Sequence, residues 1–305
     1  MVQQNLTSIQ IGKESTAGTE TSTYVQYPGI AQRGDVSPTI QEAEILVANM
    51  SGRLASDQAL HGESTYGLTT NIRLQTGQPF YWLMGAVSTT GSGTPYTPAI
   101  SNNNTVPSFS VEYVIDSDHS HKFLGCKLDS LEITLTQGQP VSANLSWVAE
   151  SHSIDTSPGS PSSRTLVPYE FHQLTTLTVN SVSYLADIRQ ATISMSNGLE
   201  RDYSLSSRDA SSITEGVREC TMNLEIRASD ETLMNLLKNR TDFAISFVLK
   251  RAGSDNDKIT ITINNAKIFA PSYDFGGNAI VDVLPVRVIG NWTVSVLDAL
   301  SSYAI

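Results

Sequence analysis

The feature that most restricts how this 305-residue chain can fold is an alternation of apolar and polar residues with a period of two. Residues 131–136 alternate Leu or Ile with Glu or Thr, and after a Gln-Gly-Gln-Pro turn the alternation resumes over residues 143–150. Because successive side chains of a strand point to opposite faces, this pattern predicts an antiparallel hairpin with one buried and one solvated face. Similar segments follow at 193–195, 222–226, 243–249, 259–264, 286–288 and 292–296. The chain is therefore predicted to be all-β.

Two segments break the alternation and favour helices. The sequence Ser-Asp-Glu-Thr from Ser229 supplies an N-cap and acidic first-turn residues, and apolar residues then recur on one helical face. An amphipathic helix is expected over residues 229–240, ending in basic side chains. A shorter helix is expected from Pro79, an N1-type proline, with a buried side made of Phe80, Trp82, Leu83 and Met84.

Three polar segments divide the chain. Residues 1–39 contain ten Ser or Thr and no sustained period, so we expect an extended N-terminal arm that orders only against a partner. Residues 88–107 and 151–168 are rich in Ser, Pro, Gly or Asn and are expected to be exposed loops. The predicted organisation is an arm (1–39), a β-rich unit with loop insertions (40–165) and a second β-rich unit with the amphipathic helix (166–305). The two units are either separate or one continuous domain.

A faint internal repeat accompanies this division. The segments Leu-Glu-Ile-Thr-Leu-Thr-Gln-Gly from Leu131 and Ala-Thr-Ile-Ser-Met-Ser-Asn-Gly from Ala191 share a pattern, and each precedes another alternating strand. The hairpins of any β-sandwich look alike, so the sequence leaves two explanations open: coincidence, or two fused copies of one β unit.

Charge and composition exclude several classes of protein. The chain carries 19 Lys and Arg against 30 Asp and Glu, a formal net charge of −11, which argues against a protein that grips nucleic acid through a basic face. Only Cys126 and Cys220 are present, too few for a disulfide scaffold or a zinc site, and we expect small buried side chains whose pairing the sequence leaves open. The first residues lack a signal-peptide pattern and no apolar stretch approaches a membrane span, so a soluble product that is not exported is expected.

Signatures of catalysis are scarce. No P-loop, G-x-S-x-G, G-x-G-x-x-G or H-E-x-x-H motif occurs. Asp116, Asp118, His119 and His121 could hold a metal, but no third ligand follows at a fixed spacing, and a polar hairpin tip between 109–115 and 123–128 is the preferred interpretation. The remaining histidines, expected to be solvated side chains rather than bases, are His61, His152 and His172.

Acidic residues give no stronger signal. The pairs that could serve glycoside hydrolysis are Glu42 with Glu44, Glu112 with Asp116, and Glu200 with Asp202, yet exposed strand positions collect acids by default. Residues 251–258 resemble a calcium loop through Asp255 and Asp257 but fit a hairpin turn better. We therefore predict no catalytic, cofactor-binding or metal-binding residues, no cofactor and no enzymatic activity.

Long polar arms, alternating strands and sheet edges that need cover instead suit assembly. The order of several motifs resembles the tail tube, or major tail, proteins of long-tailed bacteriophages and archaeal tailed viruses over about residues 60–300. The motifs that carry this resemblance are the segments 72–86 (Ile-Arg-Leu-Gln-Thr-Gly-Gln-Pro-Phe-Tyr-Trp-Leu-Met-Gly-Ala), 123–135 with its return strand 138–146, 193–200, 259–268 and 286–296.

The resemblance implies a tail-tube β-sandwich with a flanking helix, whose sheets join those of neighbouring copies into a continuous barrel around a channel. The implied product is a virion tail tube, assembled in the host cytoplasm, of stacked hexameric rings, or of trimeric pseudo-hexameric rings if the chain is duplicated. Its polar, acidic lumen would conduct double-stranded DNA without tight binding, with the arm and the two loops bridging successive rings. The implied partners are the chain itself and the tape-measure, tail terminator and distal tail or baseplate proteins, with no membrane insertion.

Two other classes of function remain as alternatives. A secreted or surface adhesin, or carbohydrate-binding β-sandwich, would stack Tyr81, Trp82 or Tyr96 on sugars. A glycan hydrolase or metalloenzyme would centre on His119 and His121.

Overall fold

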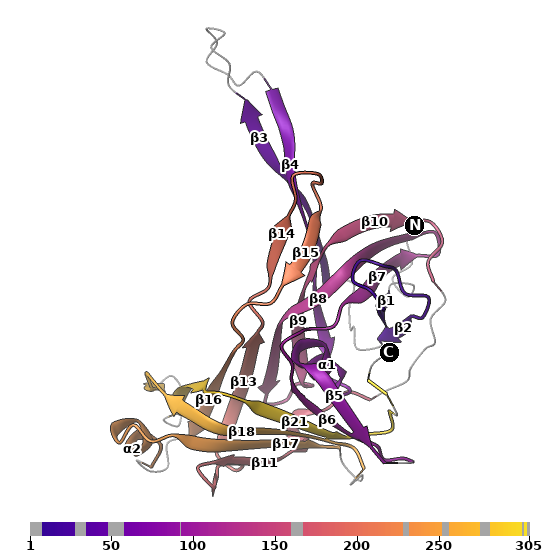
Figure 1. Ribbon diagram of the computed structural model, residues 1–305. Coiled ribbons are helices and arrows are strands. Elements are labelled where there is room, and N and C mark those ends of the chain that lie inside the picture. The colour runs from indigo at the N-terminus through magenta and orange to yellow at the C-terminus, as the bar shows by residue number, and fades with distance from the viewer. Residues whose placement is uncertain are drawn as a thin grey trace.

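The structure is a computed structural model that describes residues 8–27, 35–47, 58–91, 93–159, 167–227, 232–251, 256–274, 281–300 and 302–303. The strands are β1 (Ser8–Lys13), β2 (Val25–Tyr27), β3 (Val36–Val47), β4 (Gln58–Arg73), β5 (Gly85–Thr90), β6 (Thr97–Asn102), β7 (Phe109–Asp116), β8 (His119–Thr136), β9 (Ser142–Ala149), β10 (Ser151–Asp155), β11 (Leu174–Val179), β12 (Val182–Ser183), β13 (Ile188–Ser196), β14 (Glu200–Tyr203), β15 (Ala210–Thr214), β16 (Glu219–Arg227), β17 (Phe243–Lys250), β18 (Lys258–Ile268), β19 (Ser272–Asp274), β20 (Val281–Val288) and β21 (Trp292–Leu297). The helical elements are α1 (Gln78–Met84), the 3-10 helix η3 (Phe171–Gln173) and α2 (Thr232–Lys238). The predicted all-β class is confirmed (Figure 1).

Two antiparallel sheets form the body. The main sheet has the order β3-β4-β9-β8-β13-β16-β20-β19, and the opposing sheet has the order β12-β11-β17-β18-β21-β6-β5. They are joined at one corner, where the end of β18 pairs with β20. A third, smaller sheet, here the N-terminal sheet, has the order β2-β1-β7-β8-β10 and shares the long strand β8 with the main sheet.

The core lies between the two large sheets, as the period-two pattern predicts. On β8 the side chains of Leu131, Ile133 and Leu135 are buried, and on β18 those of Ile259, Ile261 and Ile263 are buried, while the intervening polar residues are more exposed. Burying one apolar face of each sheet against the other is the stable solution for strands of this pattern.

The predicted short helix is confirmed as α1, and every one of its side chains is buried. Proline stands in its first turn, and Gly85 ends it with φ of 90°. That left-handed conformation favours glycine because a Cβ there would lie 2.6 Å from the carbonyl oxygen of Thr105. Trp82 of α1 packs against the rings of Tyr27, Phe109 and Trp147, so the helix plugs the junction between the main and N-terminal sheets.

The predicted amphipathic helix is present as α2, over a shorter range than the expected 229–240. Leu233 and Leu236 are its buried residues, and Lys238 stands in its last turn. The expected N-cap, Ser229, lies outside the described residues.

Residues 8–27 differ from the arm expected for residues 1–39. Strand β1 pairs with β2 and β7 of the same chain, and Ile9 and Ile11 are buried. This segment orders within its own subunit because its short alternating run, Ile9-Gln-Ile11, supplies apolar side chains to the core. Residues 1–7 lie outside the described part of the chain, and β3 begins at Val36, before the expected boundary at residue 40.

The two segments expected to be loops also contain strands. Within residues 88–107, strands β5 and β6 pair with each other, and β6 pairs with β21. Within residues 151–168, β10 pairs with the start of β8, and residues 160–166 lie outside the described part. Thr and Ser are compatible with exposed strand positions, so polar composition alone did not distinguish strand from loop.

The two segments with a shared pattern, those that start at Leu131 and Ala191, lie on neighbouring strands of the main sheet. Strands β8 and β13 pair antiparallel, with Leu131 opposite Met195 and Ile133 opposite Ile193. The two segments thus place Leu131, Ile133, Ile193 and Met195 in one core.

In the described parts of the chain, neither α-helix has the length and hydrophobicity required to cross a membrane.

Candidate assembly surfaces

The β3–β4 hairpin projects from the body (Figure 1). Strand β4 pairs with β9 only from Tyr66 onward, whereas residues 58–65 pair with β3 alone. At about 3.3 Å per residue, this free part measures roughly 26 Å. A two-stranded hairpin is marginally stable by itself, so such a length indicates support from elsewhere.

The hairpin also exposes apolar side chains. Its exposed large hydrophobic residues are Ile40, Ile45, Leu46 and Leu60, and we call them the hairpin patch. Glu44 and Glu63 are exposed beside this patch and form no ion pair with another described residue. Exposed apolar residues on an unpaired strand edge favour contact with another chain.

A second hairpin, β14–β15, braces the base of the first. The Tyr203 hydroxyl donates to the Ser64 carbonyl at 2.8 Å, and the Ser64 amide donates to the Arg208 carbonyl at 2.9 Å. Arg201 donates to the Tyr66 carbonyl, and the Tyr66 hydroxyl donates to Asp209 at 3.1 Å. These bonds fix the point at which β4 leaves the main sheet, so the hairpin projects in a defined direction.

The outward face of the main sheet is polar. Alternating with the core residues are Ser, Thr and Asn side chains, including Thr134, Asn144, Thr192, Ser194 and Asn223. The same face carries both signs of charge, namely Glu132, Glu219, Glu225, Arg73, Arg227 and Arg287. It therefore has no basic stripe that would hold phosphates.

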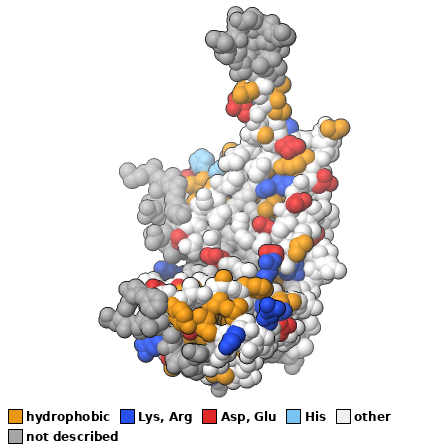
Figure 2. Space-filling model, turned by 90° about the vertical axis from the view of Figure 1, so that its left-hand side faces the viewer, with side chains coloured by type: hydrophobic (Ala, Val, Ile, Leu, Met, Phe, Trp, Pro, Cys, Tyr) orange, Lys and Arg blue, Asp and Glu red, His pale blue; other side chains and the backbone are white. Residues whose placement is uncertain are grey.

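The main sheet ends in β3 on one side and in β19 and β20 on the other. Phe269 and Tyr273, next to the β20 side, are 56% and 45% exposed. Figure 2 shows hydrophobic side chains gathered low on the body, on the face toward which α2 and β18 extend in Figure 1. Open sheet edges flanked by apolar residues are suited to contact between copies of the chain.

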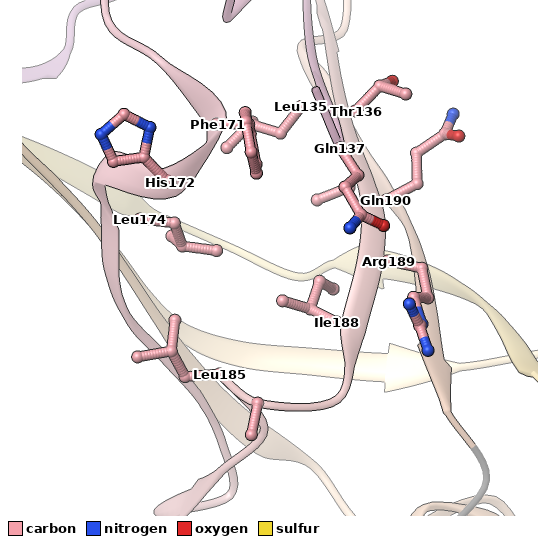
Figure 3. A pocket seen from close by; sticks show the side chains of 12 residues that line it. Leu135, Thr136, Gln137, Phe171, His172, Leu174, Leu185, Ile188, Arg189 and Gln190 are labelled. Carbon is pink, nitrogen blue, oxygen red and sulfur yellow. The ribbon is translucent and has the colours of Figure 1, made fainter. Parts of the chain in front are cut away.

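A pocket of about 310 Å³ opens at the end of the body away from the projecting hairpin. It is formed where β8 ends and β13 begins, with η3 and the turn before β13 completing the wall. We call it the basal pocket and define it by Leu135, Phe171, Leu174, Leu185, Ile188 and Arg189. Figure 3 shows apolar side chains around its centre, with Arg189 and Gln190 on one side and His172 on the other.

The histidines expected as metal candidates are not brought together. His119 bonds to Asp116 at 2.8 Å in the exposed β7–β8 turn, which confirms the predicted hairpin tip. His121 instead stacks on His152 of β10, with 2.9 Å between Nδ1 and Nε2. No cluster of three potential metal ligands occurs among the residues that the structure describes.

The His121–His152 contact was not expected, because the two residues are 31 positions apart and meet only through the β8–β10 pairing. Burial lowers the pKa of His121, and burial together with the neighbouring His121 lowers the pKa of His152. Neutral imidazoles are therefore favoured at this contact.

The acidic pairs have structural surroundings. Glu112 is buried and accepts a hydrogen bond from Ser120 at 2.6 Å, whereas Asp116 lies in the turn. Glu42 lies on the projecting hairpin, 2.5 Å from His61. Glu200 and Asp202 lie on β14, in the brace.

Strands β17 and β18 pair as an antiparallel hairpin, as predicted, with Lys250 opposite Lys258. Arg251 pairs with Asp257 at 2.8 Å, and Tyr169 donates to the same carboxylate at 2.6 Å. Residues 252–255 lie outside the described part of the chain.

Tyr81 and Trp82 are buried in α1, so they are not available to stack on a sugar, contrary to the carbohydrate-binding alternative. Tyr96 forms a bridge with Asp298. Cys126 and Cys220 are buried and free, and burial raises the pKa of both thiols, that of Cys220 to about 12.

Asn197 is a structural residue that the sequence did not single out. It is buried, and its amide nitrogen donates to the carbonyls of Leu83 and Leu128 at 3.0 and 2.8 Å. Arg218 donates to its amide oxygen at 2.6 Å. The Asn-Gly pair is the only local signal in the sequence. It indicates a turn, and it does not indicate that the Asn197 side chain links α1 to β8 by hydrogen bonds.

The chain was compared with known protein families and sequences. No curated protein sequence matched the chain. A family model described as phage tail tube protein matches residues 4–292, a range that includes the main sheet, the projecting hairpin, its brace and the opposing sheet up to the first residue of β21. Since this match covers nearly the whole chain, the protein belongs to the phage tail tube family.

Proposed function

We propose that this tail tube protein assembles with copies of itself into stacked rings whose channel conducts viral DNA into the host cell. The observation that carries the proposal is the β3–β4 hairpin, which extends beyond its own fold and exposes apolar side chains. Exposure of this kind is costly for a monomer and is relieved when a second copy covers it.

Rings would form by contact between the two ends of the main sheet. The β3 side of one copy would meet the β19–β20 side, with Phe269 and Tyr273, of the next. This is a heterologous contact, which closes into a ring when the rotation between copies divides a full turn. We propose six copies per ring if each chain supplies one tube unit, or three if the chain is a fused pair of units.

The outward face of the main sheet would line the channel. Its Ser, Thr and Asn side chains hydrate well, and its glutamates and arginines balance each other locally, as Glu219 does with Arg287. DNA would pass such a wall without being held. The acidic excess of the chain would then lie mainly away from the wall, which refines the expectation of an acidic lumen.

Partners at the two ends of the tube would be the tape-measure, terminator and distal tail or baseplate proteins, with assembly in the host cytoplasm. The role is structural and requires no catalysis.

Electron microscopy of the purified protein tests the proposal. Stacked rings or tubes, with the channel visible in end-on views, are expected as the protein concentration is raised. Monomers that persist at the highest concentration, at neutral pH and moderate salt, would contradict it.

A further inference from the structure

Two histidine side chains meet on one face of the N-terminal sheet, where β10 lies beside β8 (Figure 1). Phe123 lies opposite His152 and His121 lies opposite Ile154, so the two histidines are diagonal neighbours on the same face. The Nδ1 atom of His121 and the Nε2 atom of His152 are 2.9 Å apart and share one hydrogen bond. One nitrogen of each ring therefore points toward the other ring.

We propose that His121 and His152 together bind one divalent transition-metal ion, with Cu²⁺ preferred, and that the ion fastens β10 to β8. Imidazole nitrogen is the commonest metal ligand in proteins and suits Cu, Ni and Zn. The ion would take the place of the shared hydrogen. The N–H of the ring that donates moves to its other nitrogen, so both rings stay neutral and both facing nitrogens become ligands.

The spacing of the two nitrogens indicates the geometry of the ion. Imidazole nitrogen binds such ions at about 2.0–2.1 Å, so two ligands at a right angle lie roughly 2.9 Å apart, and two at the tetrahedral angle roughly 3.3 Å. The observed 2.9 Å matches the right angle. Square-planar or tetragonal coordination is typical of Cu²⁺ and Ni²⁺, whereas tetrahedral Zn²⁺ would require the rings to separate. Cu²⁺ also has the highest general affinity in this series.

The surroundings hold the two rings in place. His152 stacks on His121 and packs on Phe123 and Tyr66, with 5.0 and 5.7 Å between its ring centroid and theirs. Backbone pairing between β8 and β10 fixes the positions from which both side chains start. Little ordering is then needed when an ion binds, which favours affinity.

Charge near the two rings also favours a cation. Lys122, on the opposite face of β8, pairs with Glu20 at 2.8 Å and with Asp155 at 2.5 Å. Two carboxylates against one ammonium give this group a net charge of −1 (1 − 2). A cation on the neighbouring histidines is therefore attracted rather than repelled.

The remaining coordination positions are open to water, because His121 and His152 are both partly exposed. No third His, Cys, Asp or Glu completes a cluster with them among the described residues. Their other ring nitrogens bond to no described residue, so no carboxylate reinforces the ligands. A dissociation constant of micromolar order is expected, rather than the tighter binding of a site with four protein ligands.

Copper binding to the purified chain tests the site. Protein without a histidine tag, first stripped of metal with a chelator, is titrated at pH 7.5 with copper, nickel or zinc salts in a calorimeter. One Cu²⁺ per chain is expected, bound roughly tenfold or more tightly than Zn²⁺. Electron paramagnetic resonance of the copper complex should show two nitrogen ligands.

Two variants identify the ligands. His152→Phe keeps the packing on Phe123, and His121→Gln keeps a polar side chain; each should weaken Cu²⁺ binding by roughly tenfold or more. His119→Gln, in the exposed β7–β8 turn, is the matched control and should bind as the wild type does. Saturating Cu²⁺ should raise the melting temperature of the wild type and the control but not of the two ligand variants, because only the folded β8–β10 pair presents both rings.

Three results would overturn the assignment: no binding to the wild type, equally tight binding to both ligand variants, or a resonance spectrum with a single nitrogen ligand. The wild-type spectrum is decisive even if a variant fails to fold. The site lies within one chain, so none of these results bears on the proposed function. That function fails only if rings and tubes never form.

Discussion

Ile45 and Leu60 face each other across the β3–β4 hairpin, and each is about half exposed, at 50% and 49%. A cross-strand apolar pair normally lies on the buried face of a sheet. Here no third strand and no second sheet of the same chain covers it among the described residues.

Replacing both residues by threonine should abolish tube formation while leaving the fold intact. Threonine keeps the β propensity of the hairpin but removes apolar surface. Each change should alter the free energy of unfolding by no more than about 0.5 kcal/mol, as is usual at exposed positions. Sedimentation measures tube formation, and urea denaturation measures the free energy of unfolding. Gln41→Thr, on the same strand, is the control. Normal tubes from the double variant would refute a role for the pair.

Replacing Arg201 by Met should loosen the base of the hairpin. The substitution removes the bond to the Tyr66 carbonyl but keeps a long side chain. Hydrogen exchange at residues 58–66 should become faster, while exchange in the opposing sheet stays unchanged. Tyr203→Phe, which removes the bond to Ser64, should act in the same direction. If neither variant changes exchange at the hairpin, β14–β15 is not a brace.

Replacing Asn197 by Ala should destabilise the subunit strongly. The change removes the Asn197 donor from the buried carbonyls of Leu128 and Leu83, leaving Leu83 only the Arg218 guanidinium at 3.4 Å, and it removes the acceptor of Arg218 Nε. Each unsatisfied buried polar group costs about 1–3 kcal/mol, so the free energy of unfolding measured by urea denaturation should fall by roughly 3 kcal/mol. The matched control is Asn223→Ala on the exposed face of β16, which should lie within about 0.5 kcal/mol of the wild type. Equal free energies of unfolding for the two variants would show that the Asn197 hydrogen bonds contribute little to stability.

Acidification should weaken the β8–β10 contact. The pKa values of His121 and His152 are lowered in the fold, so the folded state binds fewer protons than the unfolded chain as the pH falls below about 6.5. The stability that the neutral pair contributes is therefore present above about pH 6.5 and is lost as the pH falls through the folded pKa values. Between pH 7.5 and 5.5 the melting temperature should fall by a few degrees, about the effect of 1 kcal/mol in a domain of this size.

His152→Phe should remove most of that pH dependence, because Phe retains the packing on Phe123 without a titrating group. His119→Gln, in the exposed turn, is the control. Hydrogen bonds lower the pKa of Asp155 and Asp116, so their contribution is lost only below about pH 4, whereas burial next to Glu14 raises the pKa of Glu150, which acts in the opposite direction. If the melting temperature of His152→Phe falls with pH as it does in the wild type, the His121–His152 pair is not the cause of the pH dependence.

Deleting residues 1–27 should compromise folding rather than assembly alone. The deletion removes Ile9, Ile11 and Tyr27 from the core and exposes the edge of β7. At about 1.5–3 kcal/mol for each buried apolar side chain, the loss of roughly 6 kcal/mol is comparable with the whole stability of a typical domain. Circular dichroism and light scattering should show partial unfolding or aggregation. A soluble, folded variant that merely fails to assemble would instead support an arm that orders against a neighbour.

The alternation of residues along the chain identified the regular core strands, among them β8, β9, β17 and β18, and which of their faces are buried. It also located α1, because Pro79 and a run of large apolar residues cannot continue a strand pattern. These properties are local, since side-chain direction follows directly from the period of the backbone.

Only the tertiary structure decided which strands pair. The period-two pattern of Ile9 and Ile11 is too short to show that β1 joins β7, and nothing near His121 indicates His152 as its neighbour. The hairpin patch and the basal pocket depend on the same information. Ile45 and Leu60 look like core residues in the sequence, and they are exposed because strand pairing carries them beyond the sheet that would have covered them. Pairing between distant segments is settled by the packing of the whole core, which no local pattern encodes.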